Sequence, residues 1–150
     1  MKIVINNCFG GFNISIEALK ELVLRNAECV KTMTPKTYYG GDNPKYHRQE
    51  EWESKWNDDF KEYKDLGDGM FGHPSAYNIY KDGLLYCFDD RTEKTARADK
   101  DLIEVVESFG NKADGFYASL KVVEIPDGID WEIDEYDGLE KINEAHRSWS

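Results

Sequence analysis

Tyr77-Asn78-Ile79-Tyr80-Lys81-Asp82-Gly83-Leu84-Leu85-Tyr86-Cys87-Phe88 is the stretch that decides the fold prediction. Two runs rich in aromatic and aliphatic residues flank an Asp-Gly dipeptide, which is typical of a β-hairpin with a two-residue turn. Such a turn pairs Ile79 with Tyr86 and Tyr77 with Phe88, so that these four side chains share one face. The other face receives Asn78, Tyr80, Leu85 and Cys87. The sequence therefore predicts an antiparallel hairpin over this stretch.

Helix and strand signals continue on both sides of the hairpin. Residues 2–6 form an apolar run typical of a buried strand, and a helix capped by Asn13 or Ser15 follows it to about Ala27. The remaining predicted elements are a helix over 46–63, a helix from an Asp99 cap to Gly110, a strand over 120–125, a turn at 126–128, a returning strand over 131–136 and a last helical segment after Asp137-Gly138. Residues 34–46, 64–75 and 89–98 are predicted as loops. This order predicts one α+β domain over residues 1–150, with about five strands in a mainly antiparallel sheet and three to four helices.

Composition limits the class of protein. The chain has 150 residues, of which 40% are hydrophobic, and this suffices for one domain with a sizeable core. Its net charge of −11 repels nucleic-acid phosphates and suits a basic protein partner. No apolar run approaches the roughly 20 residues of a membrane-spanning helix, and the start of the chain lacks a signal-peptide layout. We therefore expect a cytoplasmic protein that binds neither membranes nor nucleic acids.

A diglycine turn, Gly10-Gly11, lies between the first predicted strand and the first predicted helix. Backbone N–H groups at such a boundary can hold an anion, so the turn is a candidate phosphate site. The alternative is that the glycines supply positive φ angles or allow close packing, with Phe9 and Phe12 anchoring the turn in the core. Neither GxGxxG nor GxxxxGK[ST] is present.

Two arginines stand out in this acidic chain. Arg91 and Arg97 fall in one predicted polar loop, and Arg97 directly precedes a helix N-terminus. A guanidinium group and backbone amides could converge there on one phosphate. The alternatives are two solvated arginines, or an ion pair of Arg97 with Asp99 or Asp101.

An aromatic and cationic group lies at the start of the helix predicted over residues 46–63. Tyr46 and Arg48, followed by Trp52 and Trp56, could stack a nucleotide base. The tryptophans also belong to a stripe at helical spacing that continues to Tyr63, and such a stripe is typical of a core-facing helix. Both interpretations remain open at the level of sequence.

Signals for metal binding or covalent catalysis are weak. The three histidines share no ligand spacing, and HExxH is absent. Nine acidic residues crowd residues 124–144, but their spacing misses the calcium-loop pattern and indicates a solvated face or a surface for a basic partner. No GxSxG or Cys–His pattern is present. The sequence therefore assigns no catalytic residue, no metal and no cofactor.

The two ends of the chain resemble a known family. MKIVIN-x-CFGGF at the start, with ARADKDLIEVVESFG, ADGFYASLKVVEIPDGIDWEIDEYDGLEKI and EAHRSW later, resembles a family of small hypothetical proteins encoded by bacteriophages and prophages. The match covers residues 1–27 and 85–149 and leaves out the tryptophan helix, so residues 34–75 are predicted as an insertion or a mobile segment. Small phage accessory proteins often inhibit host enzymes or sequester host immune signals, many of which are nucleotides.

The resemblance and the arginines together predict a binding protein rather than an enzyme. Its expected ligand is a small phosphorylated molecule, such as a cyclic nucleotide that serves as an immune signal in the cytoplasm of the bacterial host. Pockets of this kind often form between subunits, which predicts a homo-oligomer. One alternative is an inhibitor whose Glu132, Asp134 and Glu135 bind a basic surface of a host protein. A second alternative is a metal-dependent enzyme that processes nucleotides through clustered carboxylates.

Overall fold

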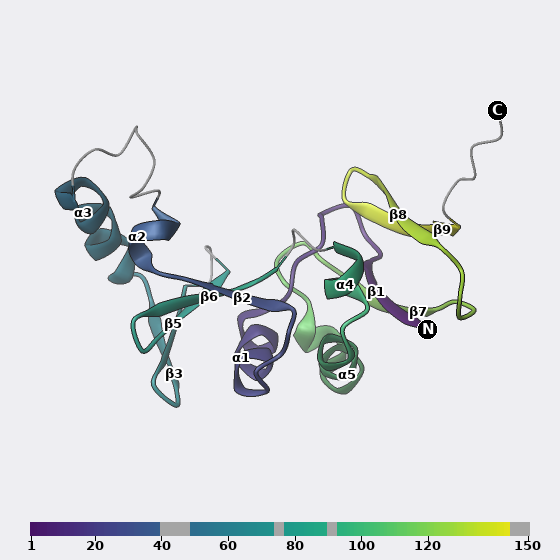
Figure 1. The fold of residues 1–150 in the computed structure, drawn as a ribbon, viewed down its shortest axis with the longest axis horizontal. Helices are drawn as coiled ribbons and strands as arrows, with labels where there is room; N and C mark the ends of the chain where they lie inside the picture. The colour runs from purple at the N-terminus through teal and green to yellow at the C-terminus, as the bar shows by residue number, and fades with distance from the viewer. Residues whose placement is uncertain (40–48, 74–76, 90–92, 145–150) are drawn as a thin grey trace. The chain divides into compact units, whose positions relative to one another are not determined.

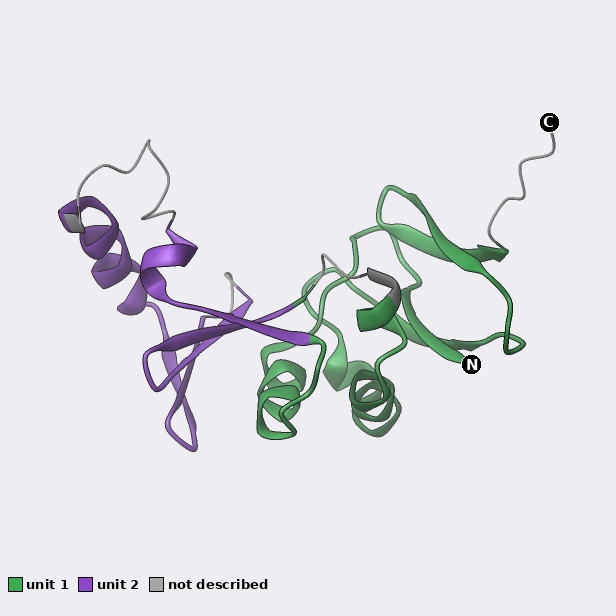
Figure 2. Ribbon diagram, viewed as in Figure 1, with its two compact units in different colours: residues 1–29, 89–150 green, residues 30–88 purple. Residues whose placement is uncertain are grey.

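The computed structural model describes residues 1–39, 49–73, 77–89 and 93–144, and Figure 1 shows its helices and strands. The chain folds into two compact units, which Figure 2 distinguishes by colour. Unit 1 combines residues 1–29 with 89–150, and unit 2 consists of residues 30–88. Helices and antiparallel strands occur in both, so the predicted α+β class is confirmed.

Unit 2 is built on a five-stranded antiparallel sheet in the order β2-β6-β5-β4-β3. Its strands are β2 (Val30–Met33), β3 (Lys64–Gly67), β4 (Met70–His73), β5 (Asn78–Lys81) and β6 (Leu84–Phe88), and its helices are α2 (Pro35–Tyr38) and α3 (Gln49–Phe60). The predicted hairpin is β5–β6. Asp82 and Gly83 both have positive φ, as a type I′ turn requires, and Ile79 pairs with Tyr86 as predicted.

Three local predictions for unit 2 are wrong, and the first is the loop over residues 34–46, which contains helix α2. Tyr77 precedes β5 with a φ of 53°, and the β5–β6 ladder ends at the pair of Asn78 with Cys87, so the expected Tyr77–Phe88 pair is not part of it. Residues 64–75, predicted as a loop, contain the β3–β4 hairpin instead. Its glycines and Asp68 make the tight turn between the strands, where three consecutive residues have positive φ.

The aromatic stripe of α3, continued by Tyr63, packs against the sheet of unit 2. Trp56 contacts Phe60, Tyr63 and Tyr80 at ring-centroid distances between 5.1 and 5.6 Å. Phe60 also contacts Phe71 of β4 at 5.8 Å. The helix is thus fixed to the sheet by ring-to-ring packing, as expected for aromatic residues at helical spacing.

Unit 1 contains two pairs of strands and most of the helices. The pairs are β1 (Lys2–Asn6) with β7 (Leu120–Glu124) and β8 (Trp131–Tyr136) with β9 (Leu139–Glu144), and the helices are α1 (Ile16–Leu24), α4 (Glu93–Arg97), α5 (Lys100–Phe109) and the 3-10 helix η2 (Gly110–Ala113). Ser15 caps α1 and Asp99 caps α5, as predicted.

The β1–β7 pair lies between helices and the β8–β9 hairpin. Helix α5 lies against both strands of the pair with α1 beside it, and the hairpin lies on the opposite side (Figure 1). Ile3, Ile5 and Trp131 are at most 6% exposed and form the core between the two strand pairs. Ile133 and Ile142 of the hairpin pack against this core. The hairpin is therefore fixed to β1 through its apolar face.

Three predictions for unit 1 are corrected. Strand β7 pairs with β1, not with the segment that follows it, and β8 pairs with β9. The segment after Asp137-Gly138 is strand β9 rather than a helix, because Asp137 and Gly138 both have positive φ and make a second two-residue hairpin turn. Part of the predicted loop over 89–98 is the helix α4. Among the described residues, no helix is long and apolar enough to cross a bilayer.

Candidate functional site

Arg97 and Glu140 form a buried ion pair in unit 1. The Arg97 side chain donates from Nη1 and Nη2 to the Glu140 carboxylate at 2.7 and 2.9 Å, and from Nη1 to the Val4 carbonyl at 3.2 Å. Both residues are 6% exposed. The guanidinium carbon lies 3.4 Å from the ring centroid of Phe12. This bidentate, stacked arrangement joins α4, β1 and β9.

The sequence prediction for Arg97 is therefore wrong about its surroundings. An exposed loop was expected, with Asp99 or Asp101 as the alternative partner. Helix α4 instead directs the side chain to Glu140, a carboxylate 43 residues further along the chain. No local spacing in the sequence could have identified that partner. With its N–H groups directed at Glu140 and Val4, this arginine does not present a phosphate-binding surface to solvent.

Asn6 connects the ion pair to three neighbouring segments of the chain. Its side chain is fully buried and donates to the carbonyls of Cys8 and Gly138 at 2.8 and 2.7 Å. Its side-chain oxygen accepts from the Ser119 amide at 2.9 Å, and its own amide donates to Glu140 at 2.7 Å. A single asparagine thus fixes the end of β1, the β8–β9 turn and the loop after η2.

The diglycine turn packs closely against two of these segments. A Cβ on Gly138 would overlap the amide nitrogen of Gly11, and a Cβ on Gly10 would overlap the carbonyl oxygen of Tyr117. The Gly10 amide donates to the Cys8 carbonyl at 3.1 Å. The geometry therefore favours the close-packing interpretation of Gly10 and Gly11 over the phosphate cradle.

Four aromatic side chains project from the segments that this network holds. Phe9, Tyr117 and Tyr136 are 68%, 85% and 73% exposed, and we call these three the aromatic patch; Phe116, next to Tyr117 in the chain, is 59% exposed. Phe9 and Tyr136 meet edge to face, with ring centroids 6.4 Å apart. The expectation that Phe9 anchors the turn in the core is wrong, whereas Phe12 lies under Arg97. The patch combines fixed backbone with exposed rings.

Acidic side chains surround Tyr136. Glu132, Asp134 and Tyr136 share one face of β8, and all three are exposed. Next to Tyr136 is a surface pocket of about 560 Å³, lined by Asn7, Asp134, Glu135, Tyr136, Leu139, Glu140 and Lys141. Asp134 accepts from Asn143 at 2.9 Å, and Glu135 accepts from the Gly138 amide at 3.1 Å. The carboxylates are thus held in place, and among the described residues Lys141 is the one cation that lines the pocket.

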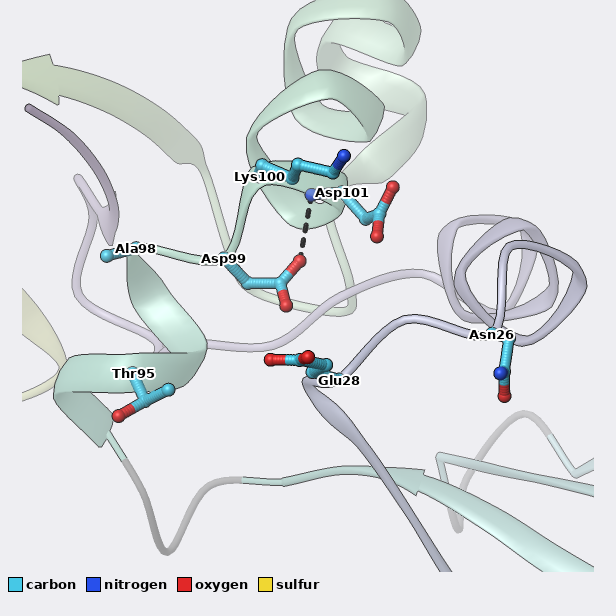
Figure 3. Close-up of a pocket in the computed structure, with 7 residues that line it drawn as sticks. All are labelled: Asn26, Glu28, Thr95, Ala98, Asp99, Lys100 and Asp101. Carbon is cyan, nitrogen blue, oxygen red and sulfur yellow. Dashed lines mark hydrogen bonds between the residues drawn. The ribbon is translucent and has the colours of Figure 1, made fainter.

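A second pocket of unit 1, drawn in Figure 3, lies at the N-terminus of α5. It is lined by Asn26, Glu28, Thr95, Ala98, Asp99, Lys100 and Asp101, and Asp99 caps the helix within it at 2.8 Å from the Asp101 amide. Burial, followed by the negative charge of Asp99, raises the pKa of the neighbouring Cys29 thiol to about 12. Three carboxylates around one lysine disfavour a phosphate here. Within the described residues, no group of three or more His, Cys, Asp or Glu side chains is placed to hold a metal ion.

The other residues predicted to bind a ligand are distributed differently. Tyr46, Arg48 and Arg91 lie outside the described residues. Trp52 is half-buried on α3 and belongs to unit 2, whereas Arg97 and the diglycine turn belong to unit 1. The structure therefore does not show the seven predicted residues in one place, and Gly10 and Gly11 are together because they are consecutive in the chain. The patch residues that the prediction missed had one signal, the adjacent aromatic pair Phe116-Tyr117 in a polar, glycine-containing segment.

Comparison with protein-family models, curated proteins and solved structures finds no match to this chain. The site is therefore interpreted from its own geometry.

Proposed function

We propose that this chain is a binding protein of the phage accessory type, which acts by occupying a protein partner in the cytoplasm of a bacterial host. The observation that carries the proposal is the aromatic patch. Its three rings are each more than half exposed, yet they belong to backbone segments held by Asn6 and by the close packing of the diglycine turn against Gly138 and Tyr117. Single exposed aromatics are common on protein surfaces, but several in one place mark an interaction site.

Rigid aromatic rings suit protein recognition for a physical reason. Tyrosine and phenylalanine supply a large contact area and lose little side-chain entropy on binding. Cys8 adds to the rigidity, because its Sγ donates to the Tyr117 carbonyl at 2.9 Å. A surface held in this way loses less conformational freedom when a partner binds, and more of the contact energy remains as affinity.

The charge of the molecule supports a basic protein as the partner. The net charge is −11, and the carboxylates of Glu132 and Asp134 extend from the patch along β8. Opposite charge on the partner accelerates its diffusional encounter with this surface, whereas nucleic acid is repelled. This proposal corresponds to the alternative of an acidic inhibitor. The capture of a phosphorylated ligand is less supported, because Arg97 is engaged with Glu140.

Site-specific photo-cross-linking tests the proposal. A benzophenone amino acid replaces Phe9 or Tyr136 in one set of proteins, and Leu24 on α1 or Tyr77 in unit 2 in a control set. Leu24 and Tyr77 are 50% and 38% exposed, so all four positions are accessible. We expect ultraviolet irradiation in bacterial cells to give one discrete protein adduct from the patch positions and none from the controls.

Two results would contradict the proposal. One is the absence of any discrete adduct from the patch, or equal adducts from the controls. The other is a small molecule retained by the protein in native mass spectrometry, with no protein bound, which would favour the capture of a ligand.

A further inference from the structure

We infer that the aromatic patch and the acidic face of β8 bind an extended basic segment through its arginine side chains, with alternate residues of that segment facing the surface. The inference rests on the proposed function and names the chemistry of the partner. It follows from three features of unit 1: the open ring faces, the spacing of the carboxylates along β8 and the excess of carboxylates over cations among the described residues on this face of the hairpin.

The ring faces are available to a cation. Phe9 and Tyr136 meet with an interplanar angle of 80°, so the edge of one ring points at the face of the other and the pair leaves outer ring surface uncovered. The two rings are 68% and 73% exposed. A guanidinium group can lie flat on such a face, where the ring quadrupole attracts it.

The carboxylates repeat along the strand at the spacing of an extended peptide. Glu132, Asp134 and Tyr136 occupy alternate positions of β8, so neighbouring members are about 6.6–6.8 Å apart along the strand. An extended ligand repeats its own same-face side chains at that interval. An arginine over Tyr136 therefore brings the arginine two positions away to the carboxylate of Asp134.

The cross-strand neighbours of these residues leave a net negative surface. Opposite Tyr136, Asp134 and Glu132 on β9 are Leu139, Lys141 and Asn143. One lysine faces two carboxylates on this side of the hairpin, and Glu135 lines the adjoining pocket. A second copy of the chain would bring like charge against this face, so a basic segment from another protein fits better.

Arginine fits this surface better than lysine does. Its planar guanidinium is less strongly hydrated than an ammonium group and both stacks on rings and pairs with carboxylates. The chain itself holds Arg97 in this way, with the guanidinium carbon 3.4 Å from the Phe12 ring centroid and two hydrogen bonds to Glu140. A lysine of the partner would keep the attraction to the carboxylates, but its ammonium group could not stack flat on a ring.

Fluorescence anisotropy with labelled peptides and the full-length protein tests the inference. Four peptides of equal length alternate serine with arginine, lysine, glutamine or leucine. We expect the arginine peptide to bind most tightly, with about a two- to fivefold advantage over lysine for each stacked ring. Glutamine and leucine peptides should bind at least tenfold more weakly than arginine.

Three variants separate the contribution of ring stacking to peptide affinity from the contribution of the carboxylates. The double substitution Phe9→Leu and Tyr136→Leu keeps apolar side chains and should remove the preference for arginine over lysine. Asp134→Asn should weaken the arginine and lysine peptides alike, by about two- to fivefold. Glu124→Gln is the matched control, because it removes an exposed carboxylate at the opposite end of the β1–β7 pair, where Glu124 pairs with Lys2, and should change neither affinity. Urea denaturation confirms that each variant remains folded.

Several outcomes would overturn the inference. Equal affinity for arginine and lysine, tightest binding of the leucine peptide, or undiminished binding after Asp134→Asn and the double leucine substitution would each do so. Self-association that the double leucine variant abolishes would assign the patch to a second copy instead. If no peptide binds while Phe9 and Tyr136 still cross-link to a protein, the arginine inference fails and the proposed function stands. If both experiments fail, both proposals fall.

Discussion

The two units of this protein use aromatic side chains in opposite ways. In unit 2, Trp56, Phe60 and Tyr63 contact one another and the rings of the sheet, and all three are partly buried. In unit 1, Phe9 and Tyr136 share one edge-to-face contact and are otherwise directed to solvent. Similar residues thus pack against a sheet in one unit and face solvent in the other.

The difference shows which rings the fold requires. Around the patch, unit 1 contains a buried polar network in which the Glu140 carboxylate accepts from the Arg97 guanidinium and from the Asn6 amide. It has an apolar core of its own around Trp131, so the exposed rings are not needed to complete it. Exposed apolar surface that folding does not require is the physical signature of an interaction site.

The largest effect on stability should come from breaking the buried ion pair. Arg97→Ala leaves the Glu140 carboxylate buried without its partner, and Glu140→Ala does the same to the guanidinium group. Each substitution should lower the free energy of unfolding of unit 1 by about 3–5 kcal/mol, measured by urea denaturation.

The double variant Arg97→Met with Glu140→Leu is the control for uncompensated charge. It should cost clearly less than either single substitution, because no charge remains buried. A loss of less than about 0.5 kcal/mol in both single variants would show that the pair is solvated and that the network does not hold the patch.

The next largest effect should come from the aromatic core of unit 2. Trp56→Ala should cost about 3 kcal/mol, the lower end for tryptophan because the side chain is only half-buried. Hydrogen exchange followed by mass spectrometry should show the lost protection in residues 30–88. Equal loss throughout unit 1 would contradict the division into two units.

A matched pair of glycines isolates the close contact at the diglycine turn. Gly83 and Gly138 are both the second residue of an Asp-Gly hairpin turn, with φ of 83° and 87°. A Cβ meets no atom at Gly83 but overlaps Gly11 at Gly138. Gly83→Ala should cost about 1–2 kcal/mol for its backbone conformation, and Gly138→Ala about 1–3 kcal/mol more. If urea denaturation gave the same loss in free energy of unfolding for both variants, the close contact between Gly138 and Gly11 would not contribute to stability.

The smallest effect on stability should follow removal of the exposed rings. Phe9→Ser with Tyr136→Thr loses one edge-to-face contact and little buried area, so the free energy of unfolding should fall by less than about 1 kcal/mol. A loss of about 3 kcal/mol would place these rings in the core of unit 1.

The sequence predicted those elements whose signals are local. The Asp82-Gly83 hairpin, the Ser15 and Asp99 caps and the core stripe of α3 each depend on residues within a few positions of one another. The sequence wrongly predicted a helix after the second Asp-Gly dipeptide, because Leu139 and Ile142 are three positions apart, a spacing that also suits a helix. Strand alternation on both sides of that turn was the signal that was available.

The candidate site was harder to predict because it is assembled from distant segments. Arg97 finds its partner 43 residues away, and Asn6 joins residues more than 100 positions apart. Exposure of an aromatic residue is also invisible in one sequence, since Phe9 and Phe12 look alike there and differ only in what packs over them. The sequence did predict an acidic surface over residues 132–135, but it did not predict the exposed rings of Phe9 and Tyr136 beside it.

Cross-linking from within the patch tests whether the exposed rings of unit 1 form the binding surface. A benzophenone amino acid at Tyr117 is placed in two backgrounds, the native chain and the Phe9→Ser, Tyr136→Thr variant, whose urea midpoints should agree closely. We expect a discrete protein adduct in bacterial cells from the native background and at least a tenfold lower yield from the variant. An adduct of undiminished yield in the variant would show that the partner is recognised elsewhere and that the exposed rings of unit 1 are not its binding surface.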